Sequence, residues 1–261
     1  MAVVHSLTNS RVSAVAGFLA SLFILASGAA QSEETGPVDA EAMQTLERMS
    51  THLAQAKSLS FRALTLFDDV RESGIKVKSA RVVRVIMKRP SSLRILAVSD
   101  SGGARSVWFD GSKFTVLQRD TSEVMELDFE GNIDGLLDEL IDKHEAQLPL
   151  ADLLYSDIAK GFKQNIISAE YIGTKLVDGV KCHHLSFEST GADWQIWIQA
   201  DANPVPRRFV ITYVTLPEKP ELLAAFDRWS LDGDAADYHF MASVPASAKK
   251  VAFGKMKSRG E

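Results

Sequence analysis

Most of the chain from residue 59 to residue 231 alternates apolar with polar positions, the period of a β-strand with one buried face. Such segments are 59–65, 83–88, 93–97, 107–109, 114–117 and 124–129. After an interruption, the pattern resumes in 166–177, 180–188, 194–199, 207–215 and 224–231. It predicts roughly ten strands.

Short turn motifs separate several of these segments. Asp110-Gly111 and Asp178-Gly179 each stand between two apolar runs. This is the strongest short-range signal for a hairpin, because both turn residues must tolerate a positive φ. Ser101-Gly102-Gly103 is a further turn signal. Strands that are joined by tight turns must be antiparallel, so we expect consecutive antiparallel strands.

Two segments show the helical period instead. Residues 38–57 carry apolar side chains at spacings of three and four, which predicts one amphipathic helix. Residues 132–163 interrupt the strands with an apolar stripe in 133–141 and a shorter one in 150–154. The expected fold is mainly β (α+β). It is a strongly curved antiparallel sheet or half-open barrel whose concave face is covered by the N-terminal helix and the helical insert.

The N-terminus has the order of a secretory signal peptide. One early cation, Arg11, precedes an apolar run over 12–25, and small residues follow. Gly28 and Ala30 offer the small side chains that a signal peptidase needs, so we expect cleavage before Gln31. The alternative is an uncleaved anchor, but the run is short for a span of about 20 residues. We therefore expect export to the bacterial periplasm without stable membrane insertion after cleavage.

The rest of the chain divides into three parts. We expect residues 31–37, which are polar with Gly and Pro, to form a flexible leader, and residues 38–244 to form a single β domain. Residues 245–261 are rich in Lys, Ser and Ala and are expected to form a loose tail. After residue 30 no stretch is long and apolar enough to span a bilayer.

Charge argues against two classes of partner. The whole chain has 29 basic and 34 acidic residues, and residues 1–30 contain one Arg and no acid, so the mature chain has a net charge of −6. Nucleic acid and anionic lipid head groups both demand clustered cations, so neither is an expected partner. The single cysteine, Cys182, cannot form an internal disulfide, so the fold depends on packing.

Cys182-His183-His184 suggests a metal site at first. In a strand, neighbouring residues point to opposite faces, so Cys182 and His184 share one face while His183, Leu185 and Phe187 share the other. A structural zinc site needs four ligands, and this pair supplies two. We therefore expect no metal and no cofactor. Cys182 is expected to be a small buried residue, and His183 a hydrogen-bonded residue of the core or cavity wall.

The segment 193–198 divides between two faces in the same way. Trp194, Ile196 and Ile198 fall on the apolar face. Trp197 falls on the polar face, where it is either covered by a helix or partly exposed at a binding rim. We favour the covered position.

Sequence features of catalysis are missing. There is no Gly-x-Ser-x-Gly elbow, no Ser, His and Asp in a context that suggests a triad, and no phosphate-binding or dinucleotide-binding glycine motif. The acidic residues at 134, 138, 139 and 142 fall on the solvent face of a predicted helix, where they serve solvation rather than acid–base chemistry. We expect a protein that is not an enzyme.

Four stretches resemble a known family: LPLADLLY (148–155), VDGVKCHHL (177–185), DWQIWI (193–198) and PRRFVITY (206–213). The family is one of predicted periplasmic proteins of unknown function, and it is similar to the LolA/LolB-like lipoprotein-carrier superfamily. The resemblance runs over most of residues 40–240. It implies a half-open antiparallel barrel that is capped by helices and has an apolar cavity for acyl chains. It supplies no catalytic residues.

Two functions follow as hypotheses. The first is a periplasmic binding or carrier protein for an apolar ligand, such as a lipid or the acyl chains of a lipoprotein. The expected cavity is lined by residues of the strands: Phe61, Val85, Met87, Ile95, His183, Leu185, Phe187, Trp194, Ile196 and Ile211. The second is an envelope scaffold that binds a protein partner through a sheet edge or the Trp197 face. A filled core without a cavity would favour the scaffold.

Overall fold

The computed structural model describes residues 37–252 except 145, 147, 149, 164 and 165. The expected signal peptide and most of the expected leader therefore lie outside the described residues. The first helix, α2 (Ala40–Gln55), begins after Asp39, whose carboxylate accepts a hydrogen bond of 2.7 Å from the backbone N–H of Glu41. Its apolar stripe is buried, which confirms the helix predicted in this region.

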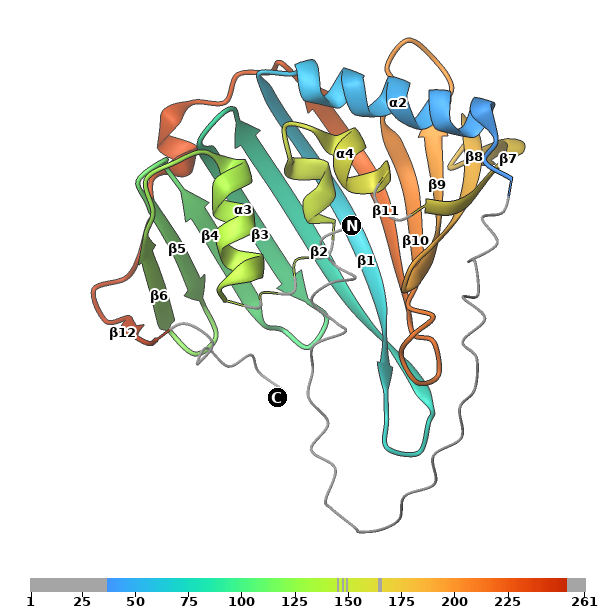
Figure 1. Cartoon of the computed structure of the whole chain (residues 1–261). Helices are drawn as coiled ribbons and strands as arrows, with labels where there is room; N and C mark the ends of the chain where they lie inside the picture. Colours follow the sequence, from blue (N-terminus) through green and yellow to red (C-terminus); the bar gives the residue numbers. More distant parts are fainter. Residues whose placement is uncertain (1–36, 145, 147, 149, 164–165, 253–261) are drawn as a thin grey trace, which may run out of the picture.

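One sheet of twelve strands forms the body of the protein (Figure 1). The strands are β1 (Ser58–Val70), β2 (Lys76–Lys88), β3 (Ser92–Ser99), β4 (Ala104–Phe109), β5 (Lys113–Gln118), β6 (Glu123–Asp128), β7 (Ile166–Val177), β8 (Val180–Ser189), β9 (Ala192–Gln199), β10 (Pro206–Thr212), β11 (Glu221–Leu231) and β12 (Lys249–Lys250). Their order in space is β12-β6-β5-β4-β3-β2-β1-β11-β10-β9-β8-β7. All neighbours are antiparallel except β12, which runs parallel to β6.

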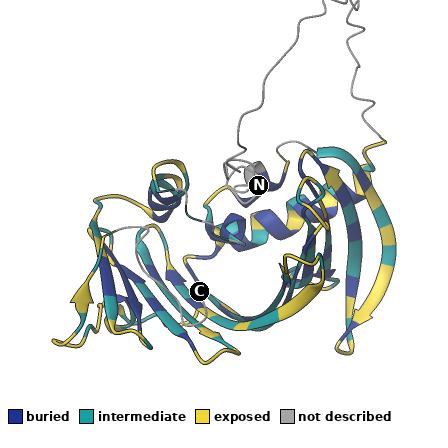
Figure 2. Ribbon diagram, turned by 90° about the horizontal axis from the view of Figure 1, so that it is seen from below, coloured by how far each residue is buried: buried dark blue, intermediate teal, exposed yellow. Residues whose placement is uncertain are grey.

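This strand order describes two meanders that lie side by side. Strands β1 to β6 follow one another in one half and β7 to β11 in the other, and β1 pairs with β11 between them. The sheet does not close on itself. Figure 2 shows its strong curvature, with helices on the concave side. The predicted half-open antiparallel sheet with helical covers is therefore confirmed.

Three short helical elements connect β6 to β7. They are α3 (Ile133–Asp142), the 3₁₀ helix η1 (Ala151–Leu154) and α4 (Ile158–Lys163), and together they form the predicted helical insert. Asn132 caps α3 by accepting a hydrogen bond of 2.8 Å from the backbone N–H of Gly135. The insert lies with α2 on the concave side of the sheet (Figure 1). Within the described part of the chain, no helix combines the length and apolar character needed to cross a membrane.

The two Asp-Gly motifs form different hairpin turns. At Asp178-Gly179 both residues have positive φ, +49° and +79°, and Val177 pairs with Val180, so the predicted two-residue turn is confirmed. At Asp110-Gly111 only Gly111 has a positive φ, and the pair of β4 and β5 residues next to the turn is Phe109 and Phe114. There the Asp110 carboxylate accepts hydrogen bonds from two backbone N–H groups of a longer loop.

A β-bulge changes which residues of β11 face the core. Arg228 has a φ of +54°, and the pairing with β1 shifts by one residue between Ser60 and Arg62. The extra residue turns Trp229 onto the concave side, where its ring centroid lies 4.6 Å from that of Phe61. A plain alternating strand, as expected over 224–231, does not predict this placement.

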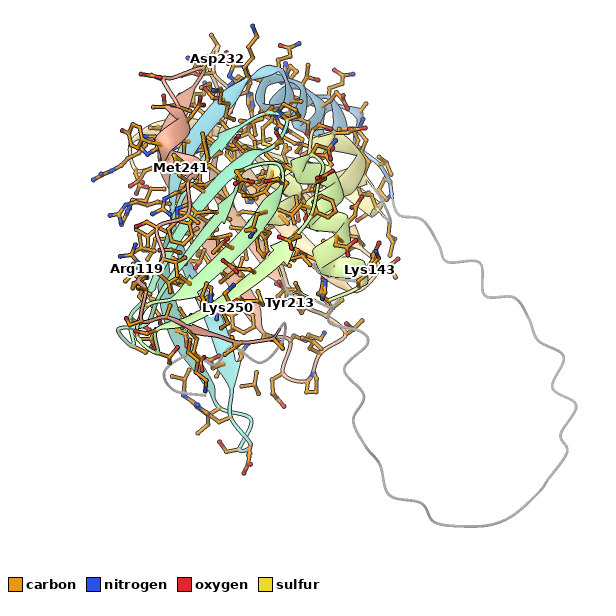
Figure 3. All side chains as sticks on the ribbon, turned by 90° about the vertical axis from the view of Figure 1, so that its left-hand side faces the viewer. Arg119, Lys143, Tyr213, Asp232, Met241 and Lys250 are labelled. Atoms are coloured by element: carbon orange, nitrogen blue, oxygen red, sulfur yellow. The ribbon has the colours of Figure 1, made fainter. Side chains whose placement is uncertain are left out.

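The C-terminal segment returns along the outer, convex face of the first meander. Beyond the 3₁₀ helix η2 (Asp237–Phe240), Val244 and Ala248 pack on a small second cluster of Trp108, Leu117 and Val124. In Figure 3 the labelled residues Met241 and Arg119 lie on the side of the sheet away from α2, α3 and α4. Strand β12 then pairs with β6, which gives part of the expected loose tail (245–261) a defined place. Residues 253–261 lie outside the described residues.

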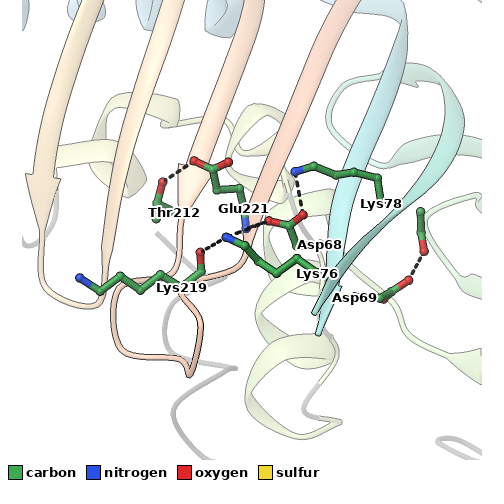
Figure 4. Close-up of polar contacts among 8 residues, drawn as sticks. Asp68, Asp69, Lys76, Lys78, Thr212, Lys219 and Glu221 are labelled. Atoms are coloured by element: carbon green, nitrogen blue, oxygen red, sulfur yellow. Dashed lines mark hydrogen bonds and ion pairs between the residues drawn. The ribbon is translucent and has the colours of Figure 1, made fainter. Parts of the chain in front are cut away.

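A buried carboxylate joins the two meanders at the far end of β1. Asp68 is 3% exposed, and its carboxylate lies 2.8 Å from Lys78 Nζ and 3.6 Å from Lys76 Nζ (Figure 4). It also accepts a hydrogen bond of 3.0 Å from the backbone N–H of Glu221. Burial raises the pKa of Asp68, but the hydrogen bonds and the two lysine charges outweigh it, so the pKa lies below its ordinary value of 3.8.

Asp68→Asn should lower the free energy of unfolding by about 1–2 kcal/mol at pH 7, because the isosteric amide loses the charge that both lysines contact. A carboxyl with a lowered folded-state pKa stabilises the fold above its ordinary pKa, and this stabilisation is lost as pH falls through the folded-state value. The difference between the two proteins should therefore shrink below about pH 3.8. Urea denaturation at several pH values measures it, with exposed Glu72→Gln as control. A constant difference down to about pH 2 would contradict the prediction.

Candidate functional site

The concave face of the sheet carries nearly all the residues predicted to line a cavity. Nine of the ten belong to the main hydrophobic cluster, and of these only Ile95 is half-buried rather than buried. We call these nine residues the concave floor: Phe61, Val85, Met87, Ile95, Leu185, Phe187, Trp194, Ile196 and Ile211. They come from β1, β2, β3, β8, β9 and β10, so both meanders contribute. Alternation along each strand places them on one face.

Trp194 lies in the centre of an aromatic group in the second meander. Its ring stacks on Phe187 with a centroid distance of 3.9 Å and an interplanar angle of 12°. The rings of Phe162 and Phe209 lie 5.3 Å and 5.6 Å away. The indole N–H donates a hydrogen bond of 2.9 Å to Ser189 Oγ, so the polar atom of this buried ring has a partner.

The helices cover this floor with their own apolar side chains. Helix α2 packs on β7, β8, β9 and α4, and it buries Leu46, Met49 and Leu53. Helix α4 buries Ile158 and Phe162, the latter directly against the aromatic group. All of these residues belong to the same cluster as the concave floor.

Polar contacts at the rim hold the insert in place. Arg89, in the turn directly after β2, donates to the carbonyl oxygens of Leu154 and Tyr155 at 3.2 Å and 3.1 Å. The Tyr155 hydroxyl donates to Asp138 at 2.9 Å, and the Ser156 backbone N–H donates to the carboxylate of residue 134 at the same distance. Burial, and then the bond to Asp138, raise the pKa of Tyr155, so the hydroxyl stays protonated. Two of the acids expected to serve solvation therefore also position the insert.

The tenth predicted residue, His183, lies beside the floor under α2. Its Nδ1 is 2.7 Å from the Tyr171 hydroxyl, so one ring nitrogen is hydrogen-bonded, whereas its place in a cavity wall stays a prediction. Burial lowers the pKa of His183, and the charge of Arg48 lowers it further, whereas Glu41 raises it. The imidazole is therefore held in its neutral form near pH 7. Asp39 also binds the Tyr171 backbone N–H at 3.2 Å, so α2 is fixed to β7 here.

Pockets open at the rim of the fold. One, with a volume of about 580 Å³, is lined by the end of α2, the start of β1, the end of β2 and residues 233–235. A second, of about 110 Å³, lies beside it. None of the ten predicted residues lines either pocket. Side chains of the described helices pack on the concave floor instead.

The family model described as "Predicted periplasmic protein (DUF2092)" matches residues 42–254. The chain belongs to this family. The resemblance to a family of predicted periplasmic proteins is thereby confirmed. No curated protein matches the sequence.

Several solved structures are similar to this DUF2092 protein in the course of the chain. Lipoprotein LppX of Mycobacterium tuberculosis is 13% identical with a TM-score of 0.45, and the match covers 73% of this chain and 96% of that one. An uncharacterized conserved protein of Thermus thermophilus is 13% identical with a TM-score of 0.45, and the match covers 81% of this chain and 99% of that one. A LolA superfamily protein of Nitrosomonas europaea is 11% identical with a TM-score of 0.39, and the match covers 77% of this chain and 97% of that one.

Strand β8 separates the Cys-His-His sequence of the DUF2092 protein as alternation predicts. Cys182 is fully buried, and burial raises the pKa of its thiol, although the charges of Arg207 and Arg208 oppose this. His184 bonds Gln195 Oε1 at 2.9 Å on the outer face, whereas His183 points to the concave side. Among the described residues, no group of three or more His, Cys, Asp or Glu side chains is arranged to hold a metal ion.

The position of Trp197 differs from the expectation that a helix covers it. It is half-buried on the outer face of the sheet, where its printed ring contacts are with side chains of β8 and β10. Its ring stacks on His184 with a centroid distance of 4.0 Å, and the Arg208 guanidinium lies 5.6 Å from its centroid. Neighbouring side chains of the sheet, rather than a helix, therefore cover it in part.

Sequence reasoning missed two kinds of residue in this DUF2092 protein. Phe162 and Phe209 were not among the expected lining residues, although Phe162 follows Ile158 at helical spacing. Arg89 and Tyr155 carried no recognisable signal, because the partners of Arg89 are 65 and 66 residues away and the partner of Tyr155 lies on a separate helix.

Proposed function

We propose that this protein is exported, loses residues 1–30, and acts in the periplasm by binding or carrying an apolar ligand, a lipid or an acylated protein, without catalysis. Among the described residues the helices fill the space above the concave floor, and by the criterion given above a filled core taken alone favours the scaffold. The observation that carries the carrier proposal is that the cover over this continuous apolar surface consists of separate helices instead of a second sheet. Transfer of an acyl chain onto such a surface gains about 0.8 kcal/mol per buried CH₂ and needs no special polar chemistry.

Helix α4 is the part of the cover that a ligand would replace. It has six residues, too few for a helix to be stable alone, so it depends on its contacts. Those contacts are the apolar packing of Ile158 and Phe162 and a surface ion pair between Lys163 and Glu47. An acyl chain beside Trp194 would make the same kind of apolar contact that Phe162 makes now. Movement of α4 would therefore exchange one apolar occupant of the floor for another.

Protein purified from the periplasm, analysed by native mass spectrometry, tests the proposal directly. We expect a mass increment that corresponds to a co-purified lipid, and saturable uptake of a fluorescent fatty acid by the delipidated protein. A chain without bound lipid that also takes up no fatty acid would contradict the proposed function.

Phe162→Ala should increase the affinity for a fluorescent fatty acid by about fivefold or more, because the truncated side chain leaves volume next to Trp194 that an acyl chain can fill. Fluorescence titration of delipidated protein measures this change.

The matched control is Lys163→Ala on the same helix. It removes an exposed ion pair worth at most about 1 kcal/mol and leaves the floor unchanged, so its affinity should stay near that of the wild type. Equal affinity in the wild type and Phe162→Ala would show that the ligand does not bind where α4 packs.

A further inference from the structure

The outer face of the sheet carries a second apolar surface where the two meanders meet. Strand pairing places Val98, Val82, Leu64 and Ala225 in one row across β3, β2, β1 and β11. A parallel row crosses β2, β1, β11 and β10. We call the two rows the outer band: Leu64, Leu66, Ala80, Val82, Val98, Val210, Leu223 and Ala225.

These residues point away from the core. Their neighbours along the strands, such as Ala63, Val83 and Ala224, belong to the concave cluster, so alternation places the band on the opposite face. None of the eight band residues belongs to either hydrophobic cluster of the described chain, and Val98 is 37% exposed. An antiparallel sheet normally presents polar residues on its solvated face, so eight neighbouring aliphatic and alanine side chains are a departure from that rule.

Arginines border the band along one side. Arg84 and Arg62 face each other across β2 and β1, next to the row that contains Val82 and Leu64. Arg208 pairs with Ala225 at the end of that row. Asp227 is the acid on this side, and it already pairs with Arg62 at 2.8 Å. The side is therefore cationic on a protein whose mature chain has a net charge of −6.

The part of the outer face next to the band is covered by the chain itself. Over β4, β5 and β6 the chain's own C-terminal segment lies on the sheet and buries Trp108 with the small apolar residues Val244 and Ala248. That segment is neither helix nor strand between η2 and β12, and it contains a turn in which the Ala248 N–H donates to the Pro245 carbonyl oxygen. The outer band lies on the same face, nearer to β1 and β11. Its side chains are also apolar, but no segment of the described chain covers them.

We propose that the outer band binds an extended segment of another protein, with small aliphatic side chains on the band and carboxylates next to Arg62, Arg84 and Arg208. This interaction surface is separate from the concave floor and does not rest on the carrier function. A second copy fits poorly, because two convex faces touch over little area. An anionic membrane also fits poorly, because it would face a mature chain with a net charge of −6, whereas a single segment can place its few carboxylates beside Arg62, Arg84 and Arg208 alone.

The probe is a fluorescein-labelled peptide of about twelve residues in which Val and Glu alternate, and its counterpart carries Lys in place of Glu. Fluorescence anisotropy should show saturable binding of the Glu peptide to the wild type and binding weaker by about tenfold or more for the Lys peptide. Val98→Asp and Arg84→Glu should each weaken binding of the Glu peptide by about fivefold or more. Leu176→Asp, at an apolar residue 73% exposed outside the band, should bind like the wild type.

Thermal denaturation of each variant ensures that only folded protein is compared. Absence of saturable binding of the Glu peptide up to roughly 1 mM would overturn the proposal, as would equal binding by Val98→Asp. Two further results would overturn the proposal because they would show that something else binds the band. One is binding to phosphatidylglycerol vesicles that Val98→Asp abolishes. The other is concentration-dependent dimerisation that Val98→Asp abolishes.

Discussion

Trp194→Ala should lower the free energy of unfolding by about 3–5 kcal/mol. The indole is 1% exposed, stacks on Phe187, and contacts Phe162 from the cover and Phe209 from β10. Its removal leaves a cavity between the sheet and the helices. None of the three neighbouring rings can move into this cavity without losing its own contacts. Chemical denaturation followed by far-ultraviolet circular dichroism measures the change.

Trp197→Ala is a matched control, since it removes the same side chain three positions away on the opposite face. The lost contacts are the stack on His184 and the approach of Arg208, so the expected loss is about 1 kcal/mol. Similar losses for the two variants would contradict the assignment of Trp194 to the centre of the core and of Trp197 to the outer face.

Gly179→Val should destabilise the domain by about 1–3 kcal/mol through backbone strain. Gly179 has a φ of +79°, which a β-branched residue tolerates badly. A Cβ at this position would meet no atom within 4 Å, so a steric clash with neighbouring residues does not contribute. The turn also sets the register of β8, which places Leu185 and Phe187 rather than His184 on the concave side. The midpoint of urea denaturation measures the effect.

Two substitutions separate strain from other causes. Gly179→Asn should cost less than about 1 kcal/mol, because asparagine adopts positive φ more readily than valine. Lys181→Ala, beside the turn and exposed, should change stability by less than about 0.5 kcal/mol. A Gly179→Val protein with the wild-type midpoint would show that the turn does not require glycine.

The fold followed from the sequence where short-range signals were sufficient. The apolar stripe predicts α2, the Asp178-Gly179 dipeptide predicts its hairpin, and alternation predicts which face of β8 and β9 is buried. Each of these signals acts within a few residues. Strand pairing between distant segments leaves no comparable trace. The bulge at Arg228, which turns Trp229 toward Phe61, arises from the pairing of β11 with β1 and has no local signature.

The composition of the candidate site and its helical cover were both predicted, but the filling of the space beneath that cover by the helices' own side chains was not. Alternation is enough to assign residues such as Leu185 and Trp194 to the concave floor. It cannot tell whether a ligand or the protein's own helix lies above them, because both present apolar atoms. The outer band escaped notice for a related reason. Leu64 and Leu66 lie in a strand in which both faces are apolar, and only the pairing across β2 and β11 shows that they form one surface.

The pairing of β1 with β11 also bears on how the chain folds. Arg62 and Asp227, which meet across it, are separated by 165 residues. Each meander consists of consecutive hairpins, whose contacts close short loops and form in microseconds. The β1–β11 ladder must instead close a very long loop, and the chain loses that entropy before the new contacts compensate for it. The concave cluster draws on both meanders, so it is complete only when this ladder has formed. We therefore expect the slow step of folding to be the same event that completes the concave cluster.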